Sequence, residues 1–240
     1  MRILLPMLSM LFSFSLLACD GEELCVGDRV MYTSGDLAVV QEVFRNGKVV
    51  INWDNSSWAD SVVDISQVSK DTRCLGHICN RDRVVYTSGD RAVVKESFRN
   101  GKVVIDWDNS SWANSVVKVS EISKVVSCTS GNLCVGHRVA YKSGDTARVK
   151  EVYEDDRVLI DWDHSSWADS VVKAREVARA FRCMGDLCAG DRVIYKSNDR
   201  ANVVEVFEDG RVRIDWDNSS WADSVVSITD LGFSAGDCRD

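Results

Sequence analysis

Short runs of apolar and β-branched residues, separated by tight-turn residues, occupy most of the chain. In residues 79–128 the turns are Ser-Gly-Asp, Asn-Gly and Asn-Ser-Ser, and an Asn-Gly pair favours a two-residue hairpin because both positions accept positive φ. No long stretch has the 3.6-residue period of a helix. We therefore expect four strands here, over residues 83–86, 92–98, 102–108 and 112–119, followed by a helical turn over residues 120–124.

The whole pattern occurs four times. The stretch from Cys25 to Tyr32 recurs at Cys79, Cys134 and Cys188, with a period somewhat above 50 residues that suits an array of small domains better than a solenoid. The intervals between the copies are short, so neighbouring domains are expected to touch. We define repeat 1 as residues 25–74, repeat 2 as 79–128, repeat 3 as 134–183 and repeat 4 as 188–238.

The N-terminal residues have the features of an export signal. Met1-Arg2 precedes an uncharged apolar run from Ile3 to Ala18, so residues 1–18 are interpreted as a signal peptide. The following Leu-Leu-Ala-Cys19 resembles a bacterial lipobox, in which the cysteine carries the lipid. We expect Cys19 to be lipidated, residues 19–24 to form a tether and the chain to be a membrane-anchored lipoprotein facing the periplasm or the cell surface. The alternative is plain secretion with a free Cys19.

Nine cysteines, an odd number, support this interpretation, because removing Cys19 leaves an even set. Regularly spaced cysteines in an exported chain indicate a disulfide framework. One scheme closes each repeat, and the other crosses the linkers and leaves Cys25 and Cys238 without partners. We predict the first, in which closure of each loop stabilises a small domain by about 4 kcal/mol. Its pairs are Cys25–Cys74, Cys79–Cys128, Cys134–Cys183 and Cys188–Cys238.

Each repeat resembles SH3-like barrels of the Tudor and mind-bomb-repeat type. The resemblance rests on the Gly-Asp-Arg-Val start, the Asn-Gly hairpin and the Val-x-Ile-Asp-Trp-Asp-Asn-Ser strand end, and it covers each repeat almost completely. It implies an all-β chain of four tandem small SH3-like barrels, each closed by a disulfide. Such relatives bind peptides or modified side chains, but a fold alone does not transfer that role.

Two tryptophans recur in every repeat. The first shares a strand face with apolar residues, so it is predicted to lie in the core (Trp53, Trp107, Trp162, Trp216). The second follows polar turn residues and is either an exposed contact residue or a lid over the barrel end (Trp58, Trp112, Trp167, Trp221). The tyrosine that ends the first strand either flanks that surface or packs beneath it (Tyr32, Tyr86, Tyr141, Tyr195). The second tryptophans and these tyrosines are the candidate ligand-binding residues.

Other chemistry is poorly represented. Asp215, Asp217, Ser219 and Asp223 partly match a calcium loop, but the glycine at position 6 and the glutamate at position 12 are missing. None of the three histidines is repeated, and no nucleophile–base pattern is present. We expect no metal, no cofactor and no enzymatic activity. Arg83 and Glu96 are expected to form a cross-strand charge pair.

Charge narrows the choice of partners. The chain has 29 Lys and Arg against 37 Asp and Glu, so an electrostatic affinity for nucleic acid or anionic lipid is not expected. The partner is expected to be a protein, peptide or glycan of the cell envelope, contacted several times. The alternative is a structural spacer without a specific ligand, and a deep pocket with converging titratable groups would instead indicate an enzyme.

Overall fold

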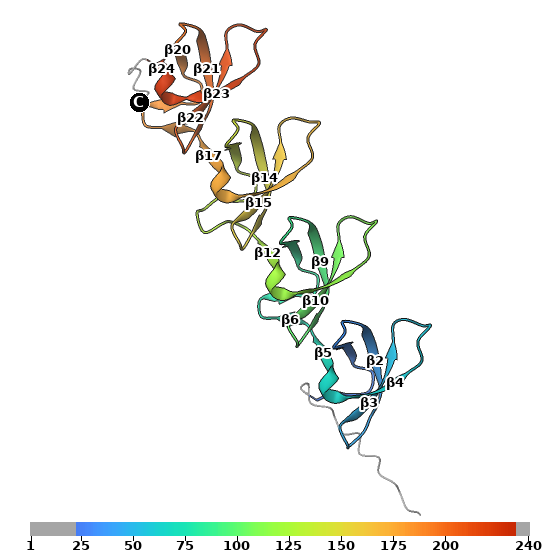
Figure 1. Cartoon of the computed structure of the whole chain (residues 1–240). Helices are drawn as coiled ribbons and strands as arrows, with labels where there is room; N and C mark the ends of the chain where they lie inside the picture. Colours follow the sequence, from blue (N-terminus) through green and yellow to red (C-terminus); the bar gives the residue numbers. More distant parts are fainter. Residues whose placement is uncertain (1–22, 234–240) are drawn as a thin grey trace, which may run out of the picture. The chain divides into compact units, whose positions relative to one another are not determined.

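The computed structural model describes residues 23–233, and these residues form an all-β chain (Figure 1). The predicted signal peptide, Cys19 and Cys238 lie outside this range. Within it, no helix is long and apolar enough to span a bilayer. The all-β prediction is confirmed, because strands and three-residue 3-10 turns are the regular elements of the described residues.

The described part of each repeat contains five strands and one 3-10 turn in the same order. In repeat 1 these are β1 (Arg29–Tyr32), β2 (Leu37–Val43), β3 (Lys48–Trp53), β4 (Ser61–Asp64), η1 (Ile65–Gln67) and β5 (Val68–Thr72). In repeat 2 they are β8 (Arg83–Tyr86), β9 (Arg91–Phe98), β10 (Lys102–Trp107), β11 (Ser115–Lys118), η2 (Val119–Glu121) and β12 (Ile122–Val126). In repeat 3 they are β13 (Arg138–Tyr141), β14 (Thr146–Tyr153), β15 (Arg157–Trp162), β16 (Ser170–Lys173), η3 (Ala174–Glu176) and β17 (Val177–Phe181). In repeat 4 they are β20 (Arg192–Tyr195), β21 (Arg200–Phe207), β22 (Arg211–Trp216), β23 (Ser224–Ser227), η4 (Ile228–Asp230) and β24 (Leu231–Phe233).

The predicted strands of repeat 2 agree with β8, β9 and β10, but the fourth strand begins three residues later than expected. The side-chain oxygen of Asn109 accepts hydrogen bonds from the backbone and hydroxyl of Ser111, and its carbonyl accepts one from the amide of Trp112. These bonds hold a turn, because an Asn side chain can replace a backbone acceptor. Trp112 therefore lies in a loop, and β11 starts at Ser115.

The strands of each repeat form an antiparallel sheet in the order fifth, first, second, third and fourth. In repeat 1, β1 pairs with both β5 and β2, β2 pairs with β3, and β3 pairs with β4. A β-bulge between Val40 and Glu42 bends β2, as bulges do. No ladder joins β4 to β5 in the described chain, so the closed barrel implied by the resemblance is not seen.

Alternating side chains of the first three strands fill a small apolar core. In repeat 2, Val84, Ala92, Val94, Val103 and Ile105 are all fully or almost fully buried. These positions alternate along each strand, as expected for a sheet with one buried face. The other repeats use equivalent residues. In all four repeats the end of the first strand therefore lies beside the end of the third strand.

The predicted disulfide pairing is wrong. The bridges cross the linkers as Cys74–Cys79, Cys128–Cys134 and Cys183–Cys188, so the predicted bonds of these cysteines to Cys25, Cys238 and one another do not form. Cys25 also takes part in a disulfide. The described repeats are consequently not closed from end to end by a sulfur bridge.

The physical reason lies in the linkers, which form hairpins rather than plain connections. β6 (Cys74–Leu75) pairs with β7 (Ile78–Cys79), and β18 (Cys183–Met184) pairs with β19 (Leu187–Cys188). In both, the two cysteines are direct cross-strand partners, with Cα atoms 3.9 and 4.0 Å apart. Gly76 and Gly185 take positive φ in the turns, which glycine accepts without steric cost. The repeat-closing scheme was predicted because it gives every repeat a complete pair, whereas these turns bring the two cysteines of each linker together.

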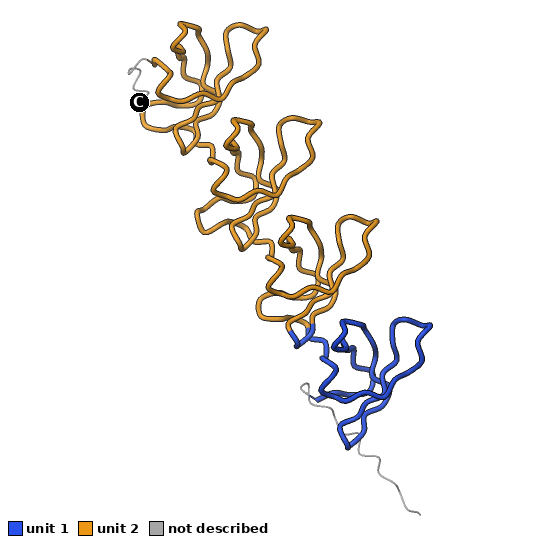
Figure 2. Tube along the Cα trace, in the orientation of Figure 1, with its two compact units in different colours: residues 1–72, 98–100 blue, residues 73–97, 101–240 orange. Residues whose placement is uncertain are grey.

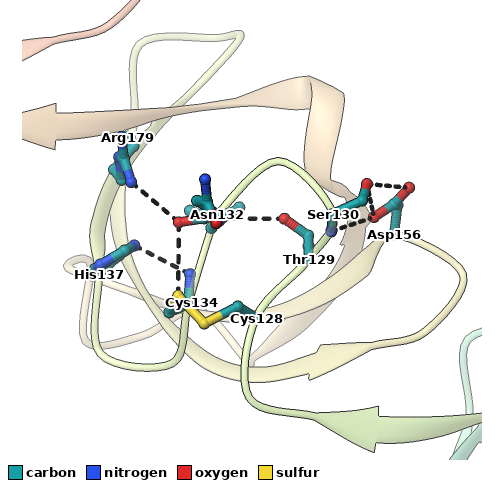
Figure 3. The surroundings of a disulfide bond; sticks show 9 residues. Cys128, Thr129, Ser130, Asn132, Cys134, His137, Asp156 and Arg179 are labelled. Carbon is teal, nitrogen blue, oxygen red and sulfur yellow. Dashed lines mark hydrogen bonds between the residues drawn. A yellow bond between two sulfur atoms is a disulfide. The ribbon is translucent and has the colours of Figure 1, made fainter.

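The hairpin between repeats 2 and 3 has one more residue and a richer set of hydrogen bonds (Figure 3). The hydroxyl of Thr129 accepts a bond from the amide of Leu133, and the carbonyl of Asn132 accepts one from the Arg179 guanidinium. Nδ1 of His137 accepts a bond from the amide of Cys134, 3.0 Å away. In the other repeats an aspartate accepts the same bond, so His137 is a structural replacement.

The described chain divides into two compact units (Figure 2). One comprises residues 23–72 with 98–100, and the other comprises residues 73–97 with 101–233. Inside the second unit the repeats share strands. β12 pairs with β8 of its own repeat and then with β14 of repeat 3, and β17 likewise pairs with β13 and then with β21 of repeat 4.

The corrected bridges can be tested by peptide mapping of the oxidised protein. Trypsin cleaves after Arg and Lys, so each described bridge lies inside a single peptide: residues 74–81, 125–138 and 183–192. Each peptide should be recovered alone, lacking the two thiol hydrogens of its reduced form. Recovery of peptide 74–81 linked to peptide 125–138 would support the repeat-closing scheme instead.

Candidate ligand-binding site

Each repeat carries a cluster of three aromatic rings at one end of its sheet. The first strand supplies a tyrosine, the third strand supplies the first tryptophan, and the following turn supplies the second. In repeat 1 the ring centroids of Tyr32 and Trp53 are 5.4 Å apart, and those of Trp53 and Trp58 are 5.5 Å apart. Both contacts are edge-to-face, a favourable geometry for aromatic pairs. The members of the other clusters are Tyr86, Trp107 and Trp112, then Tyr141, Trp162 and Trp167, then Tyr195, Trp216 and Trp221.

The second tryptophan is exposed in all four clusters. The exposed fractions of Trp58, Trp112 and Trp221 are 46%, and that of Trp167 is 45%. A ring folded over the sheet as a lid would be mostly buried. The second tryptophan is instead only partly covered by its contact with the first tryptophan. The exposed position of these four predicted site residues suits a contact surface. Their role in binding remains a prediction.

The first tryptophan links this surface to the core. Trp107 packs against the buried residues of repeat 2 and is itself half-buried. Its indole nitrogen donates a hydrogen bond to the hydroxyl of Ser115, 2.9 Å away, and the equivalent bond is present in every repeat. The first tryptophan, predicted to lie in the core, is thus only half-buried: it packs against the core and also contacts the exposed tryptophan.

The tyrosines flank the cluster and are half-buried. The hydroxyl of Tyr32 accepts a bond from the side-chain amide of Gln67. The residue after the tyrosine is a threonine in repeats 1 and 2 and a lysine in repeats 3 and 4. The ammonium groups of Lys142 and Lys196 lie 5.2 and 5.3 Å from the centroids of the tyrosine rings that precede them. Each lysine also pairs with an acidic residue, Glu176 or Asp230.

An arginine of the first strand holds the turn that carries the second tryptophan. Arg29, Arg83, Arg138 and Arg192 pair with the aspartate directly after the first tryptophan, which is Asp54, Asp108, Asp163 or Asp217 respectively. The hydrogen bond from Arg138 lowers the pKa of Asp163, and the one from Arg192 lowers that of Asp217. The recurrence of Arg and of Trp-Asp in every repeat contained this information, but sequence reasoning did not connect them.

These ion pairs contradict one other sequence expectation and also bear on the partial calcium loop. Arg83 binds Asp108 and Glu151, 2.8 and 3.2 Å away, so the expected pair with Glu96 is not among its ion pairs. Asp217, the central acid of the partial calcium loop, is bound to Arg192. In residues 23–233 no group of three or more His, Cys, Asp or Glu side chains is arranged to hold a metal ion.

Repeat 3 differs from the others at the turn. His164 replaces the asparagine, and its Nδ1 lies 2.8 Å from the hydroxyl of Ser166. Its ring stacks on Trp167 with a centroid distance of 5.1 Å and an interplanar angle of 27°. This repeat therefore presents a fourth ring, and its surface is chemically distinct from the other three.

No protein-family model matches the chain, and no curated protein matches it with significant similarity.

The two tryptophans of repeat 2 should contribute unequally to stability. Trp107→Ala removes a ring that packs on the core and should destabilise the repeat by about 3 kcal/mol, the lower end of the range for buried tryptophan. Trp112→Ala removes one edge-to-face contact and should cost about 1 kcal/mol. Amide hydrogen exchange of β9 and β10 in the full chain measures both. Equal losses of protection would mean that both rings are core residues.

Proposed function

We propose that this chain is a non-enzymatic cell-envelope lipoprotein built from four tandem SH3-like domains, which binds a protein, peptide or envelope glycan through its aromatic clusters. The observation that supports it is the exposed second tryptophan, held in one geometry in every repeat. Tryptophan is enriched among residues that dominate binding energy, because it offers a large rigid apolar surface.

The surroundings of the tryptophan suit a ligand with both apolar and polar groups. The turn before the ring carries a carboxylate, a side-chain amide and two hydroxyls, in the run from Asp54 to Trp58. The turn is fixed by the Asn55 side chain and by the Arg29–Asp54 pair, so little side-chain and backbone freedom is lost on binding. Such a surface is small, and a single copy would bind weakly.

Repetition compensates for this weakness. A ligand with repeated epitopes that engages one cluster meets the next at a high effective concentration. The shared strands of repeats 2, 3 and 4 limit the motion between their clusters. The same rigidity also favours the second candidate function, a spacer that holds another component away from the membrane without binding a specific ligand.

Binding should depend on the four exposed tryptophans together. The oxidised chain is immobilised and exposed to envelope extract, and the retained components are compared with those on a chain in which Trp58, Trp112, Trp167 and Trp221 are all changed to Ala. The quadruple variant should lose retention more steeply than any single variant. A matched control changes the exposed Val26 and Val135 to Ala. Full retention by a folded quadruple variant would favour the spacer.

Lipidation of Cys19 is tested by mass spectrometry of the N-terminal peptide of the exported protein. The expected result is an acylated Cys19 at the mature N-terminus and an unprocessed precursor for Cys19→Ala. A thioether to lipid excludes a disulfide at the same sulfur. Cys19 precedes the disulfide-bonded Cys25 by the same six residues that separate Cys128 from Cys134. A non-acylated peptide bridging Cys19 to Cys25 would therefore contradict the lipoprotein proposal.

A further inference from the structure

The contact between successive repeats in the second unit has the same design at both of its junctions. At the first, Tyr153, Leu159 and Val171 of repeat 3 pack on Val85 and Val125 of repeat 2. At the second, Phe207 and Val225 of repeat 4 pack on residues of repeat 3, namely Ala140, Ala178 and Ala180. We call the face that the later repeat contributes the head and the face that the earlier repeat contributes the tail.

Polar contacts surround both apolar contacts in the same way. A glutamate of the head, Glu151 or Glu205, pairs with the first-strand arginine of the tail, Arg83 or Arg138 respectively. An arginine of the head donates to the carbonyl of the tail tyrosine, from Arg157 to Tyr86 and from Arg211 to Tyr141. Head and tail are thus complementary in shape, charge and hydrogen bonding.

Repeat 4 exposes a tail. Ile194 stands where Val85 and Ala140 stand in the earlier repeats, and it is 47% exposed, whereas both of those residues are fully buried. Ile194, Tyr195 and Phe233 line an open groove together with Arg192 and Lys196. Arg192 pairs with one carboxylate of the described chain, that of Asp217, whereas Arg138 pairs with two.

Repeat 1 exposes a head. Phe44 stands where Tyr153 and Phe207 stand, and it is 43% exposed, whereas both of those rings are fully buried. Val62, the equivalent of Val171, is also exposed. Glu42 takes the place of Glu151 and Glu205, lies at the surface and forms no ion pair within residues 23–233. Lys48 occupies the position of Arg157 and supplies a positively charged donor.

We propose that the chain associates head to tail with copies of itself, the Phe44 face of one molecule docking on the Ile194 face of the next. The new junction repeats the one inside the chain: Phe44 against Ile194, Glu42 against Arg192, and Lys48 toward the carbonyl of Tyr195. A contact between two different faces leaves one of each free, so association continues until a ring closes or a filament forms. The inference does not require ligand binding by the aromatic clusters, although the tail of repeat 4 shares Tyr195 and Arg192 with the cluster of that repeat.

Sedimentation of the oxidised four-repeat chain over a range of concentrations tests the proposal. The wild-type chain should form a series of oligomers. Phe44→Asp and Ile194→Asp each remove the central apolar contact of one face, and each should raise the dissociation constant at least about tenfold. Both residues are exposed, so folding should be preserved. Val135→Asp, at an exposed site in repeat 3, is the matched control and should associate like wild type.

Mixing the two variants gives the decisive measurement. Phe44→Asp keeps an intact tail and Ile194→Asp keeps an intact head, so the mixture should form dimers and stop there. Persistent self-association of Phe44→Asp alone would show a tail-to-tail contact and overturn the proposal, as would a head-to-head contact revealed by Ile194→Asp alone. Glu42→Arg is a second surface variant, expected to weaken assembly through charge. A wild-type chain that stays monomeric at high concentration would also overturn the proposal.

Discussion

The constraint behind this architecture is the small apolar core of each repeat. About fifty residues bury too little apolar surface to be comfortably stable alone. The chain meets this constraint because the last strand of a repeat extends beyond the sheet of that repeat. β12 and β17 each satisfy backbone hydrogen bonds in two successive repeats, and the side chains at that crossing form an additional core of their own. Stability in the second unit is therefore a property of neighbours as much as of single repeats, as in other repeat proteins.

The disulfides fit the same logic. Each one closes a loop of only five or six residues, so its stabilisation by the chain-entropy estimate is about 2 kcal/mol, half that of a bridge across a whole repeat. What the short bridge fixes is the hairpin that leads from one repeat into the next. The cysteines thus restrain the linker hairpins, while strand pairing holds the repeats and, in the second unit, also joins successive repeats.

Much of the fold could be predicted from local pattern, and the exceptions have identifiable causes. The strands β8 and β10 could be predicted from β-rich runs bounded by turn residues. The same pattern in the other repeats predicts the equivalent strands there. The position of Trp112 was missed because the strand was extended backward through an asparagine-held turn. The pairing of Cys74 with Cys79 was missed because symmetry was weighed more heavily than the turn-forming Gly76 between them. Glu151 and Glu205 could not be assigned partners from sequence, because their arginines lie about 70 residues away, in the preceding repeat.

The short disulfides have a mechanical consequence. A bridge between the two ends of a repeat would carry any pulling force through sulfur and shield the residues in between. Here the load path runs through the sheet itself, with only the hairpin loops bypassed. A repeat that yields under tension can therefore lengthen by something on the order of 150 Å, given the reach of an extended chain. In the oxidised molecule the disulfides therefore do not prevent the repeats from unfolding and extending under a pulling force.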